Sequence, residues 1–512
     1  MKSDKQHHIE LDWIGRWATY APDRVALKSI EDDIQITYKE LYDWIGRMAE
    51  VLIHHYAIRK GDRVAVLSLN RVEHVALFYA VQRVGGILLP MNYRLAVPEL
   101  TYQIEDAEPS LIVFEKEFQA TIDQLEHPSL KATSWKSFLN LVDEVQGTPS
   151  VTMNASFDDP CMILYTSGTT GRPKGALITH KMLFWNSINT GLRLDLTQQE
   201  VILTFAPFFH TGGWNVLTTP VLHRGGKVIL LKKFDADQVL LLSDSERATI
   251  LFGVPTMMQM MADSPAFTQT TLESIRYAIV GGEPMPIYLI ETWNQKGVPI
   301  RQGYGLTEFG PNVFSLNEED AIRKIGSVGF PNFYIETRIV NDNDEEVPVN
   351  EIGELLLKGP VCTTGYWNNE KATNETIQNG WLRTGDLVRK DEEGYFYIVD
   401  RKKDMIISGA ENIYPAEIEH VLREHPLIKE AAVIGVPHEQ WGEVGHAFYS
   451  TSNASSVSVD DLQAFCKQRL AKFKIPKFFT HLEDLPKSDS GKILKRNLTD
   501  LTKPQKTTNS NT

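Results

Sequence analysis

The sequence predicts an α/β protein with a large N-terminal domain of several subdomains, built on stacked, mostly parallel sheets, and a small α+β C-terminal domain. Three observations lead to this prediction. Strand-like and helix-like segments alternate through the first three-quarters of the chain. The strand-like runs are apolar on both faces, as buried parallel strands are. Near residue 350 the pattern changes to shorter strand-like runs that are typical of a small antiparallel unit.

The alternation begins at the apolar run 63–67 and continues with helical spacing of apolar residues over 70–84. A second strand-like run covers 86–90. The same order recurs after three later runs, namely 227–231, 249–252 and 276–280. Strands that alternate with helices in this way indicate parallel pairing, because each helix carries the chain back across the sheet.

The C-terminal part is expected to begin after the charged stretch 400–404, which follows the strand-like runs 354–358 and 395–399 of the small β-unit. Beyond it we expect a helix over 415–424 with Pro415 in its first turn, strands over 431–436 and 446–449, and a helix over 459–470. The expected domains are therefore an N-terminal domain over 1–400, a C-terminal domain over 401–500 and a disordered tail over 501–512.

Composition excludes some classes of function. The chain has 512 residues and a net charge of 52 − 66 = −14, which argues against nucleic-acid binding because that needs a basic face. A local basic pocket for a small anion remains compatible with this charge. The three cysteines are far apart in the sequence and form no C-x-x-C motif, which argues against both a disulfide framework and a zinc site. Few cysteines, no apolar signal segment and no apolar run of membrane length predict a cytoplasmic protein without a transmembrane segment. Transient membrane contact and a homodimer stay open.

The sharpest local feature is the loop Tyr165-Thr-Ser-Gly-Thr-Thr-Gly-Arg-Pro-Lys-Gly175, which directly follows the strand-like run 161–165. It combines hydroxyl side chains, glycines and two cations. Glycines let the backbone approach an anion closely, while hydroxyls, backbone N–H groups and the cations Arg172 and Lys174 stabilise phosphate oxygens. Gly175 follows Lys174, so the loop departs from the G-x-x-x-x-G-K-[ST] pattern of P-loop kinases and GTPases.

This loop resembles that of the adenylate-forming (AMP-binding) superfamily, which includes acyl-CoA synthetases, firefly-type luciferases and the adenylation domains of peptide synthetases. The resemblance covers about residues 36–496, and four further motifs occur in the family's order. It implies that this protein is an enzyme that binds ATP and Mg²⁺, that residues 1–400 form an AMP-binding domain and that residues 401–500 form a mobile C-terminal domain.

The second motif is Gln302-Gly-Tyr-Gly-Leu-Thr-Glu308. Its aromatic side chain suits a purine, its glycines and hydroxyl suit a phosphate, and its single carboxylate suits Mg²⁺. The resemblance implies that Tyr304 stacks on adenine, that Thr307 contacts the α-phosphate and that Glu308 holds the metal. The segment Gly281-Gly-Glu-Pro284 matches the family's adenine-contacting turn.

The third motif is Thr384-Gly-Asp386, whose carboxylate could accept hydrogen bonds from ribose hydroxyls or cap a helix. The fourth, over 400–417, resembles the family's hinge. There Arg401 matches a residue that touches the ribose, and Lys403 matches the position about which the C-terminal domain rotates. Ser408 and Gly409 fall on the side where CoA enters. Many fatty acyl-CoA synthetases have a second glycine where this chain has Ala410, which puts the shape of the thiol tunnel in doubt.

The fifth motif, Pro486-Lys-Ser-Asp-Ser-Gly-Lys-Ile-Leu-Lys495, contains Lys492. The resemblance implies that Lys492 bridges the acid carboxylate and the α-phosphate, where an ammonium group balances the charge that develops as one anion attacks another. The expected catalytic residues are Lys492, Thr307 and His210. The expected ATP and AMP contacts are Thr166, Ser167, Gly168, Thr169, Thr170, Lys174, Gly282, Glu283, Pro284, Tyr304, Gly305, Thr307, Asp386 and Arg401.

The segment Ala206-Pro-Phe-Phe-His-Thr-Gly-Gly-Trp214 matches the family's acyl-pocket lining. His210 fits a position that gates the thiol tunnel, although a core histidine is an alternative reading. The expected acyl-pocket residues are Phe209, His210, Thr211, Gly213, Trp214, Gly281 and Gly303.

The resulting expectation is a carboxylic acid–CoA ligase, most similar to medium- and long-chain fatty acyl-CoA synthetases, with aryl and dicarboxylic acids as alternatives. ATP and the acid would give acyl-AMP and pyrophosphate, and CoA would then take the acyl group. Alternatives are an adenylating enzyme that loads a separate carrier protein, a luciferase-like oxygenase, and a nucleotide-binding regulator without catalytic activity.

Overall fold

The computed structural model describes residues 11–125, 130–147, 150–166, 173–282, 285–408, 411–439, 441–451, 457–488 and 491–502. The chain divides into two compact units. Unit 1 comprises residues 1–337 and 356–383, and unit 2 comprises residues 338–355 and 384–512. The domain boundary that we expect at residue 400 stays a prediction. Of the disordered tail expected over 501–512, Leu501 ends a helix and residues 503–512 lie outside the described residues.

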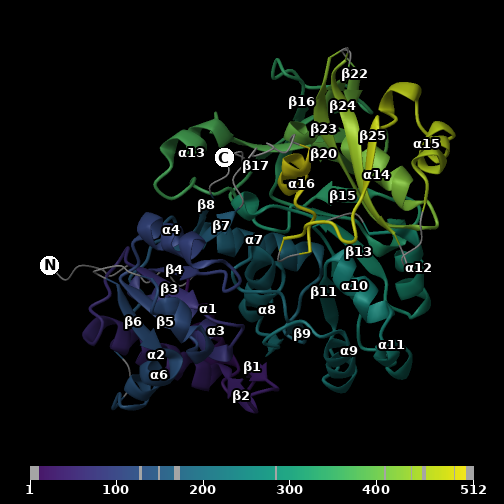
Figure 1. Ribbon diagram of the computed structural model, residues 1–512. Helices are drawn as coiled ribbons and strands as arrows, with labels where there is room; N and C mark the ends of the chain where they lie inside the picture. Colours follow the sequence, from purple (N-terminus) through teal and green to yellow (C-terminus); the bar gives the residue numbers. More distant parts are fainter. Residues whose placement is uncertain are drawn as a thin grey trace, which may run out of the picture. The chain divides into compact units, whose positions relative to one another are not determined.

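The first sheet of unit 1 carries the phosphate loop near one edge. Its strand order is β6 (Lys131–Ser134), β5 (Leu111–Phe114), β3 (Arg63–Leu67), β4 (Ile87–Pro90), β7 (Pro160–Thr166) and β8 (Lys174–Thr179). All neighbours pair in parallel except β7 and β8, which are antiparallel. Helix α4 (Val97–Ala107) packs on one face, while α2 (Tyr38–His54) and α6 (Trp135–Asp143) pack on the other (Figure 1).

The second sheet of unit 1 is parallel in its centre. Its order is β15 (Ser327–Pro331), β14 (Phe314–Ser315), β13 (Ile300–Tyr304), β12 (Tyr277–Val280), β11 (Ile250–Gly253), β9 (Val201–Thr204), β10 (Lys227–Leu230), β1 (Val25–Ser29) and β2 (Ile34–Thr37). The strands β14, β15 and β2 are antiparallel to their neighbours. One face is covered by α7 (His180–Arg193) and α8 (Thr218–Arg224). The other face is covered by α9 (Ala236–Ser245), α10 (Pro255–Ala262), α11 (Pro265–Gln269) and α12 (Ile287–Gln295).

The two sheets share one hydrophobic core. Helix α3 (Val72–Val84) is buried at every residue, as expected of a helix with packing partners all round. Its cluster includes Val64 of β3 in the first sheet and Val228 of β10 in the second. Removing this apolar surface from water stabilises the contact between the sheets at roughly 25 cal/mol per Å². Unit 1 also contains α1 (Trp13–Tyr20), η1 (Lys116–Phe118), α5 (Gln119–Ile122), η4 (Glu318–Asp320), α13 (Glu370–Thr376) and β18 (Ile377–Gln378).

Unit 2 is built on a separate sheet. Its order is β22 (Glu411–Ile413), β21 (Ile406–Ser408), β24 (Gly442–Thr451) and β23 (Ile428–His438), with β25 (Phe478–His481) pairing in parallel with β24. Helices α14 (Pro415–Arg423) and α15 (Val459–Lys467) share a core with this sheet. On α16 (Lys495–Leu501), Leu498 belongs to a second cluster. The strands β16 (Glu336–Val340), β17 (Gly353–Lys358), β19 (Trp381–Lys390) and β20 (Phe396–Arg401) follow one another in a further sheet segment.

The α/β class and the parallel sheets that the sequence predicts are confirmed. The run 63–67 forms β3 as expected, and the helix expected over 70–84 begins two residues later, at Val72 of α3. Pro415 opens α14, where its missing N–H costs nothing because that position has no helical partner. Within the described residues, no helix is long and apolar enough to cross a membrane.

Candidate active site

The predicted site segments of unit 1 follow the carboxyl ends of its parallel strands. β7 ends at Thr166, β9 at Thr204, β12 at Val280 and β13 at Tyr304. In open α/β sheets, ligands bind beyond the carboxyl ends of the strands, because the loops there converge and connect to helices. Parallel pairing thus gathers motifs that lie far apart in the sequence.

The phosphate loop connects two antiparallel strands, and its first and last residues face each other. Thr166 of β7 pairs with Lys174 of β8, and the Thr166 hydroxyl donates to the Lys174 carbonyl at 3.4 Å. The Lys174 ammonium lies 5.2 Å from the centre of the Tyr366 ring, within the range of a cation–π contact. The predicted contacts Ser167, Gly168, Thr169 and Thr170 lie outside the described residues.

Glu308 lies in the short helix η3 (Thr307–Phe309), and its carboxylate reaches the start of the phosphate loop. The Thr166 hydroxyl donates to Glu308 Oε1 at 3.3 Å, although 142 residues separate the two. The Tyr366 hydroxyl donates to the same oxygen at 2.9 Å. The structure therefore brings together Thr166 and Glu308, two of the predicted site residues.

Tyr366 is a residue of this cluster that sequence reasoning missed. Tyr366 forms an isolated antiparallel β-bridge with Ala176 of β8. The N–H of the next residue, Trp367, donates to the Gly175 carbonyl at 2.8 Å. Burial and the adjacent Glu308 carboxylate raise the pKa of Tyr366, so its hydroxyl stays protonated and serves as a donor. The available signal was the aromatic pair after Gly365, but nothing in the spacing links it to Glu308.

The side chains around Glu308 fit a magnesium ion that arrives with a nucleotide. No group of three or more His, Cys, Asp or Glu side chains is suited to hold a metal among the described residues. Mg²⁺ commonly takes one or two protein carboxylates and fills its other positions with phosphate oxygens and water. The hydrogen bonds from the Thr166 and Tyr366 hydroxyls both end on Oε1 of Glu308, which orients the carboxylate.

Three predicted glycines lie where backbone segments approach closely. A Cβ on Gly281, after β12, would lie 3.3 Å from the carbonyl oxygen of Gly303 on β13. A Cβ on Gly305 would lie 2.0 Å from the Pro311 carbonyl oxygen. Packing alone therefore requires glycine at 305. The Tyr304 ring meets Phe314 of β14 edge-on at 5.8 Å, and Gly282 has a φ of +90°. The predicted contacts Glu283 and Pro284 lie outside the described residues.

The predicted acyl segment 206–214 runs into the π-helical turn η2 (Gly212–Val216), a rare conformation that is frequent at functional sites. A Cβ on Gly213 would lie 2.5 Å from the Pro207 carbonyl oxygen, so this glycine has a packing role. The Thr211 hydroxyl accepts from the Asn215 side chain at 3.1 Å. The rings of Phe209 and His210 are tilted by 59° to each other, with their centres 4.5 Å apart.

Trp214 lies in the hydrophobic core with no exposed surface. Its ring stacks on Phe208 at 4.1 Å, and its Nε1 donates to the Phe208 carbonyl at 2.6 Å. His74 meets it edge-on at 5.5 Å, and burial lowers the pKa of His74 to about 3. The expected contact of Trp214 with an acyl group stays a prediction.

Within unit 2 the two predicted ribose residues form an ion pair. Asp386 and Arg401 face each other across β19 and β20, with Arg401 Nε 2.6 Å from Asp386 Oδ1. The Thr384 hydroxyl accepts from the Asp386 N–H at 3.0 Å, so the carboxylate is held in place.

Lys492 lies on an exposed turn at the base of a short hairpin. The Ser488 N–H donates to the Lys492 carbonyl at 2.7 Å, and Lys487 and Ile493 form a bridge. The predicted hinge residue Lys403 lies in the short helix η5 (Lys402–Asp404), and Ser408 ends β21. Gly409 lies outside the described residues.

A mostly buried charge cluster links the hinge segment of unit 2 to the chain that follows Lys492. Lys495 Nζ lies 2.8 Å from Glu419 Oε1, and Asp400 Oδ2 accepts from the Ala416 N–H at 2.9 Å. Burial acts to lower the pKa of Lys495, but the carboxylates of Glu419 and Asp400 outweigh it and raise that pKa. Lys495 therefore stays charged at neutral pH and holds two carboxylates together.

Replacing Lys495 by Met should destabilise unit 2 by about 2–3 kcal/mol, because two mostly buried carboxylates lose their counter-ion. Native-state hydrogen exchange of the α14 and β23 amides measures this local loss. The matched control is Lys429→Met, which removes an exposed ion pair with Asp484 and should cost about 0–1 kcal/mol. Equal losses in the two variants would contradict the role of the cluster.

Comparisons with known proteins agree over nearly the whole chain. The family model described as AMP-binding enzyme matches residues 14–367, and that of the AMP-binding enzyme C-terminal domain matches residues 417–492. A feruloyl-CoA synthase from an Amycolatopsis species is 39% identical over 483 residues, which cover 94% of this chain and 97% of that protein. A 2-succinylbenzoate–CoA ligase from Bacillus cereus is 36% identical and covers 96% and 98%.

Solved structures show the same fold. The o-succinylbenzoate CoA synthetase of Bacillus subtilis, in complex with its acyl-adenylate intermediate, superposes with a TM-score of 0.87 at 35% identity and covers 95% of this chain and 98% of that chain. A fatty acyl CoA synthetase of Mycobacterium tuberculosis superposes with a TM-score of 0.79 at 34% identity and covers 96% and 97%. The match of both family models in the same order, together with these full-length relatives, shows that the chain belongs to the AMP-binding enzyme family.

Proposed function

We propose that this protein is an AMP-forming acid–CoA ligase. The observation that carries the proposal is the extent of the likeness, since the feruloyl-CoA synthase match spans 94% of this chain and 97% of the relative. The residue types support it, because Lys174 and Glu308 in unit 1 and Lys492 in unit 2 are cations and a carboxylate of the kind that a nucleotide with Mg²⁺ needs.

In the first step, an oxygen of the acid carboxylate attacks the α-phosphorus of ATP, and the bond to the bridging oxygen of pyrophosphate breaks. The reacting groups are both anions, so the enzyme must align them and reduce their repulsion. We propose that Lys174 and the phosphate loop bind the phosphates and that Lys492 neutralises the charge that develops at the α-phosphate. Mg²⁺, when bound at Glu308, supplies further charge neutralisation.

In the second step, the CoA sulfur attacks the acyl carbonyl, the bond to AMP breaks and the thiol proton is released to solvent. AMP is a good leaving group, whereas the original carboxylate has none. We propose that rotation about Lys403 exchanges the groups needed for the two steps, and that Ser408 and Gly409 lie on the CoA side.

The acid that we propose is aromatic rather than fatty. The two relatives with the highest identities above have names that refer to feruloyl and succinylbenzoate groups. In this chain the Phe252 ring lies against Gly212, and the Tyr93 ring meets Phe209 edge-on at 5.3 Å. Rings in such arrangements favour an aryl partner.

Pyrophosphate release from Mg·ATP tests the proposal when it is measured with aryl, fatty and dicarboxylic acids, each with and without CoA. We expect repeated turnover only with an aryl acid and CoA together, accompanied by thioester and AMP in equal amounts. Turnover with fatty acids and CoA, but not with aryl acids, would overturn the proposed choice of acid and would still support a CoA ligase.

A single turnover that ignores CoA would instead indicate a carrier-protein acceptor. If no acid gave pyrophosphate release, the result would favour a nucleotide-binding regulator without catalytic activity. Either result would overturn the CoA ligase.

A further inference from the structure

The acyl segment of unit 1 is held by a side chain from the other sheet. Asn70 lies in the connection between β3 and α3 and is 3% exposed. Its Nδ2 donates to the Ala206 carbonyl at 3.0 Å, and its Oδ1 accepts from the Phe208 N–H at 3.1 Å. One planar amide thus binds two backbone groups that lie two residues apart, as a neighbouring strand would.

The hydrogen bonds of Asn70 fix Ala206 and Phe208, the residues on either side of Pro207. Trp214 Nε1 donates to the Phe208 carbonyl at 2.6 Å, so both backbone polar groups of Phe208 are bound to side chains. The Phe208 ring lies in the core against Trp214 and His74. The next ring, Phe209, contacts Tyr93 instead. The path of the acyl segment therefore depends on two side chains rather than on sheet hydrogen bonds.

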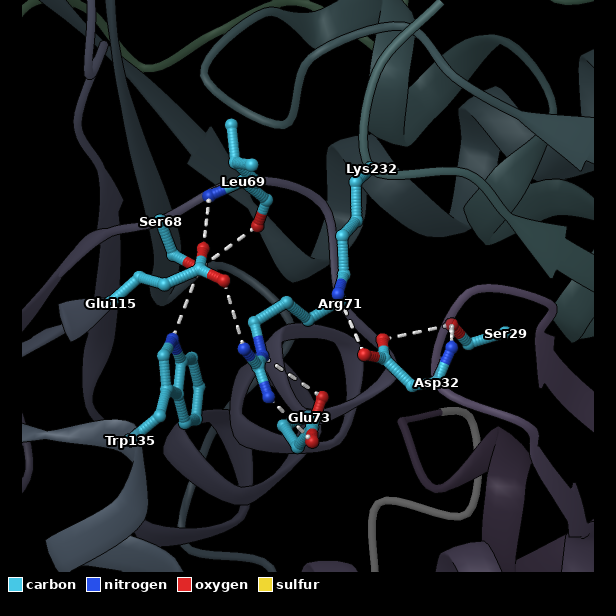
Figure 2. Close-up of polar contacts among 9 residues, drawn as sticks. All are labelled: Ser29, Asp32, Ser68, Leu69, Arg71, Glu73, Glu115, Trp135 and Lys232. Carbon is cyan, nitrogen blue, oxygen red and sulfur yellow. Dashed lines mark hydrogen bonds and ion pairs between the residues drawn. The ribbon is translucent and has the colours of Figure 1, made fainter. Parts of the chain in front are cut away.

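The residues on either side of Asn70 are anchored by a network of polar contacts (Figure 2). Glu115, after β5, accepts from the Ser68 hydroxyl at 3.2 Å and from the Leu69 N–H at 3.1 Å. Arg71 donates to Glu115 at 3.0 Å and to both oxygens of Glu73, at 3.1 and 2.9 Å. A bidentate guanidinium–carboxylate pair fixes orientation as well as distance. The residues on both sides of Asn70 are therefore held to the first sheet.

We propose that Asn70 is a positioning residue that sets the path of the segment 206–210 and thereby the affinity for the acid. The proposal rests on the proposed function, in which this segment lines the acid site. Removing a buried hydrogen-bonding side chain leaves the Ala206 carbonyl and the Phe208 N–H unpaired, and the segment would shift to satisfy them. Among the described residues, the Asn70 side chain hydrogen-bonds to Ala206 and Phe208 and not to Thr166, Lys174 or Glu308, so we expect the affinity for ATP to change little.

The test compares kinetic constants of wild type, Asn70→Ala and Asn70→Asp in the full chain, using the best acid of the wild-type panel. For Asn70→Ala we expect the KM of the acid to rise by about tenfold or more, with the KM of ATP and of CoA changed less than about twofold. Asn70→Asp keeps the shape and the acceptor but loses the donor toward Ala206. As the pH falls from about 9 to 6, its carboxyl, whose pKa burial should raise, gains a proton that restores the donor. The ratio of the acid KM in Asn70→Asp to that in wild type should therefore fall toward low pH.

The control is Asp235→Ala, which removes the N-cap of α9, a bond from the Gln238 N–H at 2.8 Å, and so lowers fold stability away from the acyl segment. The proposal fails if the KM values of ATP and acid rise together in Asn70→Ala. It also fails if the Asn70→Asp ratio does not change with pH, or if Asp235→Ala raises the KM of the acid equally. Wild type that is inactive with every acid would instead overturn the proposed function.

Discussion

Replacing Lys492 by alanine should lower the rate of acid-dependent pyrophosphate release by about 10²–10³-fold, the usual effect of removing one group that stabilises developing charge. The affinity for Mg·ATP should change only a few-fold, because the phosphate loop and Lys174 remain. The side chain lies on an exposed turn, so its loss should leave the fold intact. Rapid-quench measurement of pyrophosphate and equilibrium nucleotide binding together give the two values.

Two controls sharpen the Lys492 prediction. Lys487→Ala removes a cation from the other side of the same hairpin, where it pairs with Glu430 at 2.5 Å. This variant should leave the rate of pyrophosphate release and the affinity for Mg·ATP nearly unchanged. Conversion of supplied acyl-adenylate and CoA to thioester should stay close to wild type in Lys492→Ala, since that step needs no attack on phosphorus. A loss of ATP affinity as large as the loss of rate would show that Lys492 binds substrate rather than stabilises the transition state.

Replacing Glu308 by Gln should also lower pyrophosphate release by about 10²–10³-fold and should raise the Mg²⁺ concentration needed for half-maximal rate. Glutamine keeps the shape and an oxygen that accepts from Thr166 and Tyr366, so the cluster can stay folded while its charge is lost. A magnesium titration at fixed ATP measures the shift.

Tyr366→Phe is the matched variant for Glu308, because it removes only the 2.9 Å hydrogen bond and keeps the carboxylate charge. Its rate should fall by about tenfold, in line with the loss of one hydrogen bond to a charged group. If the rate of Tyr366→Phe were as low as that of Glu308→Gln, the loss of rate in both variants would be attributed to disturbed local packing and not to the charge of Glu308. An unchanged magnesium requirement in Glu308→Gln would exclude Glu308 as a metal ligand.

Much of the fold could be predicted because its signals are local. The apolar run of β3 and the helix-opening position of Pro415 each reflect a physical preference of a few consecutive residues. Motifs such as Gln302–Glu308 could be recognised for the same reason. Exact ends were harder: the helix expected over 459–470 ends as α15 at Lys467, because the last turn depends on which carbonyls find partners.

The fold class, the order of the motifs and the residue types of a nucleotide site could all be derived from the sequence. Which of these residues meet depends on how the chain packs. Glu308 joins Tyr366 across 58 residues and Thr166 across 142, and Asn70 joins Phe208 across 138. No periodicity spans such distances. These contacts arise because parallel strands bring their carboxyl ends to one edge, and because the buried amides and carboxylates there must find partners that only the packed sheets supply.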